Sequence, residues 1–218
     1  MQLNADLRQR ACLDTHSLPW IDSPAPGVQR RMLDRDGGEI ARATSLVKFA
    51  PHRSFPAHTH GGGEEFFVLD GVFSDEFGDF GPGSYLRNPV GSRHRPHTNP
   101  GTTIFVKLCQ MHPDDQTPVR IDTHKAQWQP GLVPGLSVLP LHQYGTEQVA
   151  LVRWEPGTQF NAHTHWGGEE IFVIEGVFAD ELGDYPAGTW LRNPAGSRHC
   201  PYSTTGCTIY VKVGHLPG

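Results

Sequence analysis

The stretch His163-Thr-His-Trp-Gly-Gly-Glu-Glu-Ile-Phe-Val-Ile-Glu-Gly176 decides how this chain folds. It places two histidines one residue apart, then a glutamate, and then an apolar run that ends in glycine. Side chains two apart on a strand project from the same face, so His163 and His165 are expected to point into one interior. Glu169 follows a glycine turn and adds a carboxylate. Imidazole and carboxylate groups in this pattern indicate a site for a divalent metal ion.

The same pattern occurs earlier in the chain, from His58 to Gly71, as His-Thr-His-Gly-Gly-Gly-Glu-Glu-Phe-Phe-Val-Leu-Asp-Gly. A shift of about 105 residues aligns His58–Lys107 with His163–Lys212 without a gap, and about three positions in five are identical. The match extends upstream at a shift of about 108 residues, because copy one carries about three extra residues near Ile40–Ala43. The sequence therefore contains a duplication with two candidate metal sites.

The chain of 218 residues has room for two domains of about 100 residues, a common domain size. The segment Met111–Pro118 is short and polar and carries two prolines, which is typical of a connection between domains. We predict domain 1 over residues 1–113 and domain 2 over residues 114–218.

Each copy is predicted to be all-β. The 25 glycines and 19 prolines indicate frequent turns, and only the first ten residues allow a helical period. Strands this short and numerous close most naturally into a barrel or a rolled sandwich. The predicted strands, paired between the copies, are Ala43–Phe49 and Gln148–Trp154, Glu65–Leu69 and Glu170–Ile174, Tyr85–Asn88 and Trp190–Asn193, and Thr102–Leu108 and Cys207–Val213.

Composition excludes several partners. The net charge is −5 with mixed signs, and no run of lysine or arginine could follow a nucleic-acid backbone. No apolar stretch approaches the roughly 20 residues of a membrane span, and the amino terminus lacks a signal peptide, so we expect a cytoplasmic protein without membrane contact. The four cysteines, Cys12, Cys109, Cys200 and Cys207, form no regular framework and are expected to be reduced.

A second repeated motif supplies a fourth candidate ligand in each copy. It reads Pro89-Val-Gly-Ser-Arg-His94 and Pro194-Ala-Gly-Ser-Arg-His199. The candidate metal ligands are His58, His60, Glu64 and His94 in copy one, and His163, His165, Glu169 and His199 in copy two. Glu65 and Glu170 are adjacent alternatives for the carboxylate, but strand alternation places them beside the site or on the surface.

These spacings resemble the two sequence motifs of the cupin superfamily. Gly157, five residues, His163-x-His165, three residues, Glu169, six residues and Gly176 match the first motif. Gly188, five residues, Pro194-x-Gly196, two residues and His199 match the second, and copy one departs from both only in His52, which replaces the opening glycine. The resemblance implies a bicupin of two tandem jelly-roll barrels, in which the three histidines and the glutamate of each copy bind a metal ion.

The repeats are also similar to the cupin domain of the ChrR family of anti-sigma factors. Both copies contain Gly-Glu-Glu, Gly-Val-Phe-Ser/Ala-Asp-Glu and Leu-Arg-Asn-Pro-x-Gly-Ser-Arg-His. This resemblance implies a regulatory module that senses an oxidant or a small molecule and changes a contact with a protein partner. The amino-terminal zinc module of that family has a His-x-x-x-Cys-x-x-Cys signature, whereas the first forty residues here contain only Cys12 and His16. A sigma factor is therefore not the expected partner.

The ligand set leaves the metal and the function open. It suits zinc, the first expectation, as well as iron, manganese, nickel or copper. Tetrahedral zinc would be filled by the protein ligands, which suits a structural or sensor site. Ferrous iron would keep two positions for dioxygen and substrate, and the alternative function is therefore a metal-dependent dioxygenase acting on a small ketone or diketone, as in cupins similar to ChrR. A small-molecule ligand, a protein partner and a homodimer are the partners considered.

The surroundings of the two sites differ. Gly61, Arg95 and His97 of copy one correspond to Trp166, Cys200 and Tyr202 of copy two, which predicts different access or different small molecules. We expect the Cys200 thiol to point away from the metal, with a redox-reactive thiol as the alternative.

Two further repeated residues have expected structural roles. Arg87 and Arg192 are expected in ion pairs, for which Asp75-Glu76 and Asp180-Glu181 are available, with a carboxylate clamp as the alternative. Trp20 and Trp128 are expected to pack the leading segment of each copy on its barrel.

Overall fold

The computed structural model describes all 218 residues and consists almost entirely of β-strands. Its one helix is the 3-10 turn η1 (Thr15–Ser17), and no helix is long enough to cross a membrane. The first ten residues form strand β1 (Gln2–Leu3) and a turn, so the helical period that they allow is not used. The eight predicted strands all lie within observed strands, which confirms the all-β prediction.

The chain folds into two compact units whose composition differs from the predicted domains. Unit 1 comprises residues 1–5 and 19–126, and unit 2 comprises residues 6–18 and 127–218. The predicted division into residues 1–113 and 114–218 follows the sequence repeat. In the structure the leading segments are exchanged, because each adds a strand to the barrel of the other copy.

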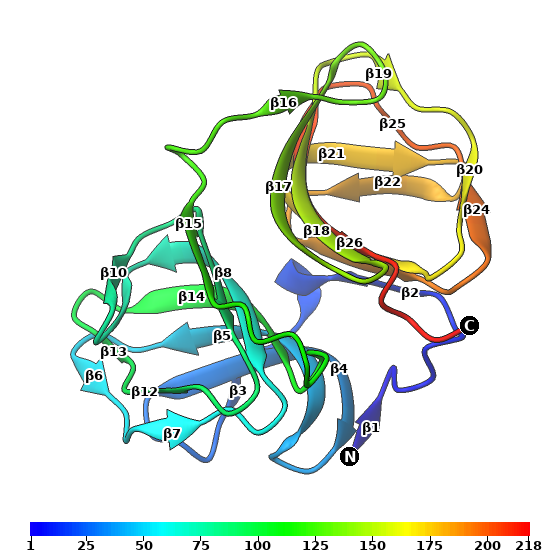
Figure 1. The fold of residues 1–218 in the computed structure, drawn as a ribbon. Coiled ribbons are helices and arrows are strands. Elements are labelled where there is room, and N and C mark those ends of the chain that lie inside the picture. Colours follow the sequence, from blue (N-terminus) through cyan, green and yellow to red (C-terminus); the bar gives the residue numbers. More distant parts are fainter. The chain divides into compact units, whose positions relative to one another are not determined.

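Unit 1 is a barrel formed by one large sheet, one small sheet and a strand pair (Figure 1). The large sheet has the order β1-β4-β5-β14-β8-β11-β15, with β3 also paired to β4. Its strands after β1 are β3 (Ile21–Asp22), β4 (Val28–Gly37), β5 (Ala41–Phe49), β8 (Glu64–Gly71), β11 (Ser84–Asn88), β14 (Thr102–Leu108) and β15 (Val119–Asp122). The small sheet contains β6 (Arg53–Ser54), β9 (Phe73–Asp75), β10 (Gly78–Phe80) and β13 (His97–Thr98), and the pair is β7 (His58–Thr59) with β12 (Arg93–His94).

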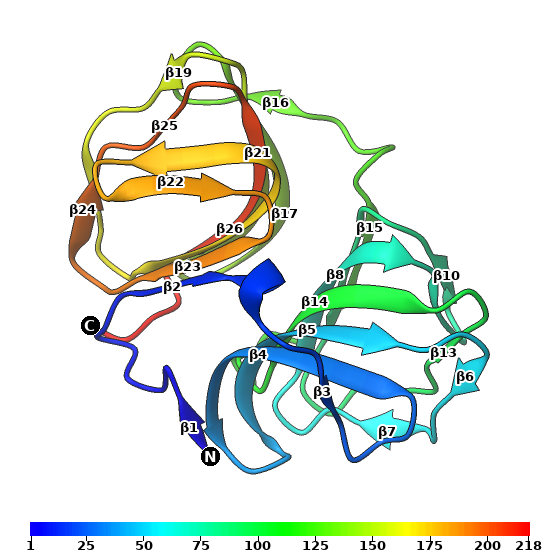
Figure 2. The same cartoon turned by 180° about the vertical axis from the view of Figure 1, so that it is seen from behind.

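Unit 2 repeats this architecture with a longer central strand. Its main sheet has the order β16-β17-β18-β26-β21-β23-β2, and β21 (Glu169–Asp180) continues past a bulge to pair with β22 and β25. Strands β21 and β22 run side by side across the barrel in both views (Figures 1 and 2). The other strands are β2 (Ala11–Asp14), β16 (Gln129–Pro130), β17 (Leu136–Tyr144), β18 (Glu147–Trp154), β19 (Thr158–Gln159), β20 (His163–His165), β22 (Gly183–Pro186), β23 (Thr189–Asn193), β24 (Ser197–His199), β25 (Tyr202–Ser203) and β26 (Cys207–Val213).

The exchanged strands occupy matching positions in the two units. In unit 2, β2 pairs antiparallel with β23, and Ala11 lies opposite Arg192; the two strands lie side by side in Figure 2. In unit 1, β15 pairs antiparallel with β11, and Val119 lies opposite Arg87. Each barrel edge is thereby covered by backbone hydrogen bonds rather than left open.

Apolar side chains fill the inside of each barrel and reach the predicted metal sites. The core of unit 1 includes Phe66, Val68 and Phe73, and the Phe73 ring lies 5.8 Å from the ring of His94. Unit 2 has a matching core, in which the Phe178 ring lies 6.3 Å from the ring of His199. These cores hold the histidine-bearing strands in place.

One departure from the cupin motif has a backbone consequence. Gly157 of copy two has a φ of 79°, which glycine adopts without strain. His52, at the matching position in copy one, has a φ of 56° and is therefore also left-handed. Unit 1 keeps the turn that the motif glycine provides but builds it with a side chain that disfavours this conformation.

Candidate metal centre

Three histidines of unit 2 converge from two short paired strands. His163 and His165 lie on β20, and His199 ends β24, where it pairs with His163. One ring nitrogen from each histidine lies within 4.8 Å of the others. The closest pair is Nε2 of His165 and Nε2 of His199, 3.0 Å apart.

Glu169 completes this set at the start of β21. Its Oε2 atom lies 3.6 Å from Nε2 of His165 and 3.6 Å from Nε2 of His199. The amide of Asn193 donates a hydrogen bond of 3.0 Å to the same oxygen. Asn193 belongs to the repeated Leu-Arg-Asn-Pro motif, so the motif contributes an orienting amide that sequence reasoning missed.

Unit 1 repeats the arrangement with His58 on β7, His60 directly after β7, His94 on β12 and Glu64 at the start of β8. Oε2 of Glu64 lies 3.6 Å from Nε2 of His60 and 3.7 Å from Nε2 of His94. Asn88 donates a hydrogen bond of 3.0 Å to Glu64. The structure therefore brings all eight predicted residues together in two sets of four.

Both sets have the donor chemistry of a metal site. In unit 1, Nε2 of His60 and Nε2 of His94 are buried without a hydrogen-bond partner, which is unfavourable unless something binds them. Four donors at about 2.1 Å from one ion would lie about 3.0 to 3.4 Å apart, depending on geometry. The observed separations of 3.0 Å to 3.7 Å are close to that range.

Backbone carbonyls set the tautomer of the first histidine in each set. Nδ1 of His58 lies 3.1 Å from the carbonyl oxygen of Pro56, and Nδ1 of His163 lies 2.9 Å from that of Asn161. A carbonyl oxygen only accepts, so Nδ1 carries the hydrogen and Nε2 keeps its lone pair. That tautomer leaves the Nε2 atom available as a ligand.

An aspartate orients the last histidine of each set. Nδ1 of His94 lies 3.2 Å from Oδ2 of Asp75, and Nδ1 of His199 lies 3.2 Å from Oδ2 of Asp180. A carboxylate behind a histidine is a recurrent feature of metal sites, where it fixes the ring and raises its basicity. The sequence signal was an aspartate repeated at the same place within an apolar strand.

Arg87 is engaged elsewhere than predicted. Arg87 donates to Oε2 of Glu65 and to Oδ2 of Asp115, both at 2.7 Å, and all three residues are buried. The predicted structural role of Arg87 is therefore confirmed, but its partners are not Asp75 and Glu76. Glu65 is likewise an ion-pair partner in the interior and not a surface group.

Arg192 contacts the leading segment that folds with unit 2. Its Nη2 atom donates to the carbonyl oxygens of Asp6 (3.1 Å) and Gln9 (3.3 Å). Asp180 holds His199, and Glu181 accepts from the backbone of Cys200. Arg192 thus anchors the exchanged leading segment.

The leading tryptophans lie under basic side chains. The guanidinium of Arg31 lies 4.5 Å from the ring centroid of Trp20, and that of Arg153 lies 4.2 Å from the ring centroid of Trp128. Both tryptophans are half-buried, so they pack by cation–π contact as well as by apolar contact.

Burial and charge shift the protonation of the unit 2 residues. Burial, together with the neighbouring His163 and His199, lowers the pKa of His165 to about 3. Burial also raises the pKa of the Glu169 carboxyl. For His199, burial acts to lower the pKa, but the hydrogen bond that its ring donates to Asp180 and the charge of Glu169 outweigh burial and raise the pKa. A bound cation would compensate the buried carboxylates.

Unit 2 has a cavity of about 710 Å³ at this set. His163, His165 and Glu169 form part of its lining. Most of the wall is apolar, including Leu136, Val152, Trp154, Phe178, Ile209 and Val211, and no lysine or arginine lines it. The set therefore opens onto an apolar chamber of a size typical for small-molecule sites.

Only one of the three residues that distinguish site two lines this cavity. Trp166 lines the cavity and is 83% exposed. The loop residue Leu132 also lines the cavity and is 88% exposed. Cys200 and Tyr202 are not among the lining residues. The Cys200 thiol donates to the carbonyl oxygen of Phe160 at 3.3 Å, in agreement with the expectation that it points away from the set.

Unit 1 has larger or charged residues at matching positions. Arg30 of unit 1 stands at the position of Val138 in unit 2, because Arg30 lies opposite Val47 and Val138 lies opposite Val152. Arg30 makes an ion pair of 3.0 Å with Glu39. Cys109 and Met111 correspond to the cavity residues Gly214 and Leu216. A small pocket of unit 1, beside Phe49 and Phe73, leaves no room for a water-sized molecule.

Two barrels that each hold a histidine triad define a bicupin. The sequence profile of the ChrR cupin-like domain matches residues 8–112 and again residues 116–217, and the chain belongs to this family. No curated protein matches the chain significantly.

Solved structures share the fold at low sequence identity. A Nostoc punctiforme protein provisionally described as a dioxygenase has a TM-score of 0.80 and 18% identity, over 94% of this chain and 82% of that one. The Escherichia coli protein Ylba has a TM-score of 0.74 and 16% identity, over 98% and 94%. An oxalate decarboxylase from Lactobacillus farciminis has a TM-score of 0.66 and 11% identity, over 94% and 86%. At such identities the likeness shows the fold alone.

Proposed function

We propose that unit 2 is the reaction site of a metal-dependent oxygenase that acts on a small, uncharged, largely apolar molecule. The observation that carries this proposal is the cavity of about 710 Å³ whose lining includes His163, His165 and Glu169. A purely structural metal site needs no such chamber. The same cavity makes an enzyme a better proposal for unit 2 than a closed sensor.

The residues that would hold the metal are His163, His165, Glu169 and His199. A divalent ion in this set, iron above all, would supply open positions for dioxygen and for a substrate oxygen. Asp180 and Asn193 fix the orientations of His199 and Glu169, and the low pKa of His165 keeps that ring neutral. The apolar walls offer water few hydrogen-bond partners on the ligand side of the cavity.

The cavity lining defines the class of substrate. No cationic side chain lines the cavity, so an anionic substrate would lose hydration without gaining a counter-charge from the walls. Thr164 and the indole N–H of Trp154, which is buried without a partner, are neutral polar groups available for hydrogen bonds. This lining favours a ketone or diketone over a dicarboxylate such as the oxalate named for one structural relative.

A second role is proposed for unit 1. Its four residues are set as in unit 2, but Arg30, Cys109 and Met111 stand where Val138, Gly214 and Leu216 line the unit 2 cavity. With bulkier side chains in place of the chamber, a structural or sensing role suits this site, and zinc fits a site filled by protein ligands. Membership of the ChrR cupin-like family supports a regulatory role of this kind.

Metal analysis combined with oxygen uptake tests these proposals. Iron-loaded protein should consume oxygen with uncharged aryl ketones or diketones and not with dicarboxylates. His165→Ala should abolish uptake, whereas the matched variant His60→Ala in unit 1 should retain it. Stoichiometric zinc in both units, with no uptake by the iron-loaded protein across the ketone panel, would overturn the oxygenase and leave the sensing role.

A further inference from the structure

We propose that Arg10 is a positioning residue for the unit 2 ligands, although it lies in the leading segment, far from them in sequence. Arg10 lies just before β2, within the segment of residues 6–18 that folds with unit 2. Two chains of hydrogen bonds, here called arms, run from its guanidinium group to two different residues of the candidate ligand set. The inference rests on the metal site proposed above.

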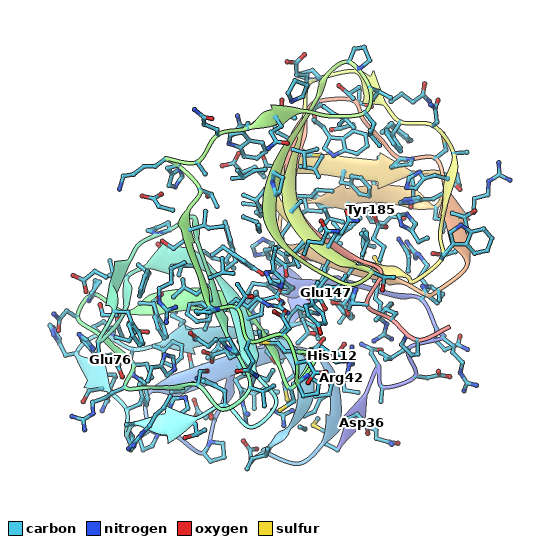
Figure 3. The ribbon with its side chains drawn as sticks, in the orientation of Figure 1. Asp36, Arg42, Glu76, His112, Glu147 and Tyr185 are labelled. Atoms are coloured by element: carbon cyan, nitrogen blue, oxygen red, sulfur yellow. The ribbon has the colours of Figure 1, made fainter.

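The first arm reaches His199. Nη2 of Arg10 donates to the hydroxyl of Tyr185 at 2.7 Å, and this hydroxyl donates to Oδ1 of Asp180 at 2.6 Å. The other oxygen of Asp180 lies 3.2 Å from Nδ1 of His199. A hydroxyl has one hydrogen, so accepting from Arg10 commits Tyr185 to donate to Asp180. Tyr185, marked in Figure 3, is only 4% exposed, so the arm runs through the interior of unit 2.

The second arm reaches Glu169. Nε of Arg10 donates to Oδ1 of Asn193 at 3.2 Å, and Nδ2 of Asn193 donates to Oε2 of Glu169 at 3.0 Å. Because its oxygen accepts from Arg10, the amide must present its NH₂ group to the carboxylate. The rigid guanidinium fork therefore fixes the directions of both arms at once.

Unit 1 contains one of these arms only. Arg120 donates to Oδ1 of Asn88 at 3.2 Å, and Asn88 donates to Glu64, which reproduces the arm to the glutamate. Phe80 stands where unit 2 has Tyr185, so the arm to the histidine has no hydroxyl. Arg120 occupies a different backbone position from Arg10. It lies opposite Leu86, and the residue at the matching position of unit 2 is Cys12, which lies opposite Leu191.

The two arms of unit 2 both depend on Arg10. Arg10 itself is exposed, so its own hydrogen bonds contribute modestly, but they set the orientation of buried groups that contact the ligands. Docking of the leading segment and the order of the unit 2 ligands are thereby linked through one side chain. Loss of Arg10 should loosen His199 and Glu169 together.

Metal-loss kinetics in the full chain test this role. The background protein carries His60→Ala and His94→Ala, which remove two candidate ligands of unit 1. It is loaded with cobalt, and the rate at which a chelator removes the cobalt is measured. Arg10→Met and Tyr185→Phe should each release cobalt about 3- to 10-fold faster and alter the cobalt absorption spectrum. The double variant should release cobalt no faster than Arg10→Met alone, because Arg10→Met already breaks both arms and Tyr185→Phe breaks only the first. Arg10→Lys should restore part of the slow release.

Arg8→Met is the matched control, since Arg8 lies in the same segment and pairs only with Asp6 on the surface. Its release rate should equal that of the background protein. If the background protein binds no cobalt, the proposed metal site fails. If it binds cobalt but Arg10→Met and Tyr185→Phe release it as slowly as Arg8→Met, the positioning role is overturned while the metal site stands. Should Arg10→Met not fold, Tyr185→Phe carries the test, because unit 1 has phenylalanine at this position.

Discussion

Asp180 holds His199 through Nδ1 at 3.2 Å, on the side of the ring opposite to the Nε2 atom that faces Glu169. The hydrogen bond therefore aligns the ring without occupying the nitrogen that would bind a metal. Asp180 is buried and is itself fixed by Tyr185 and by the backbone of Leu182. The orientation of His199 is thus built in before any ligand arrives.

Asp180→Asn should weaken metal binding at unit 2 about 10- to 100-fold, as is usual when an orienting partner of a ligand is lost. Competition with a chromophoric chelator would measure this change. Asp75→Asn is the matched variant for unit 1 and should weaken only that site. Equal affinities in Asp180→Asn and wild type would show that the hydrogen bond has no role in metal binding.

Metal binding at unit 2 should weaken as pH falls through a value above the ordinary histidine pKa of 6.5. The reason is that Asp180 and Glu169 raise the pKa of His199 against the effect of burial, so a proton competes with the metal there first. His165, with a pKa of about 3, adds no competition near neutrality. In Asp180→Asn the raising partner is gone and the midpoint should move to lower pH. Dissociation constants measured across the pH range would decide, and an unmoved midpoint would contradict this assignment.

His52→Gly should stabilise unit 1 by about 1 kcal/mol, because a left-handed conformation strains a residue with a Cβ. The matched change Gly157→His should destabilise unit 2 by a similar amount. A Cβ at Gly157 would meet nothing within 4 Å, so that effect would come from the backbone alone. Denaturant unfolding with a probe in each unit would measure both, and a destabilised His52→Gly variant would contradict the prediction.

Val138→Arg should close the unit 2 cavity, because it copies Arg30 of unit 1 at the same register. Binding of an uncharged aromatic ketone should weaken at least tenfold, a loss of about 1.4 kcal/mol. Metal content should stay unchanged, since Val138 is not one of the four ligand candidates. Isothermal titration would measure binding, with Val138→Leu as the control for a change of side chain without a charge. Unchanged ketone binding in Val138→Arg would place the ligand elsewhere.

A fragment of residues 19–126 should unfold at a higher temperature than a fragment of residues 1–113. The first contains β15, which covers the edge of β11, whereas the second leaves that edge unpaired. Open edges also favour aggregation, so the second fragment should associate. Thermal unfolding and size-exclusion chromatography would compare them, and equal stability would show that β15 contributes little.

Local patterns were sufficient to predict the strands and both ligand sets. His58, His60 and Glu64 lie within seven residues, where strand alternation and one glycine turn decide their directions, and His94 lies at a fixed place in a repeated motif. The strand exchange could not be predicted, because the local pattern of a leading strand does not say which barrel edge it will pair with.

The partners of charged residues were also beyond local reasoning. The sequence offers Asp75 as a partner for Arg87, yet Asp75 faces His94, and Arg87 binds Asp115 in the segment between the copies. Such choices depend on which side of a strand each group faces after the sheet has bent. The cavity could not be predicted for a similar reason. That Val138 stands where unit 1 has Arg30 is evident only once the register of β17 is known.

The exchange of leading strands has an evolutionary consequence. A single-copy chain built in this way could not complete its own barrel, because its first strand belongs in the sheet of a neighbour. Two such chains would form a strand-swapped homodimer, and gene duplication with fusion would give the present polypeptide. Fusion frees the two halves from identical sequences. One barrel can then keep Tyr185 and an open chamber while the other keeps Phe80 and Arg30, a division of labour that a symmetric dimer could not encode.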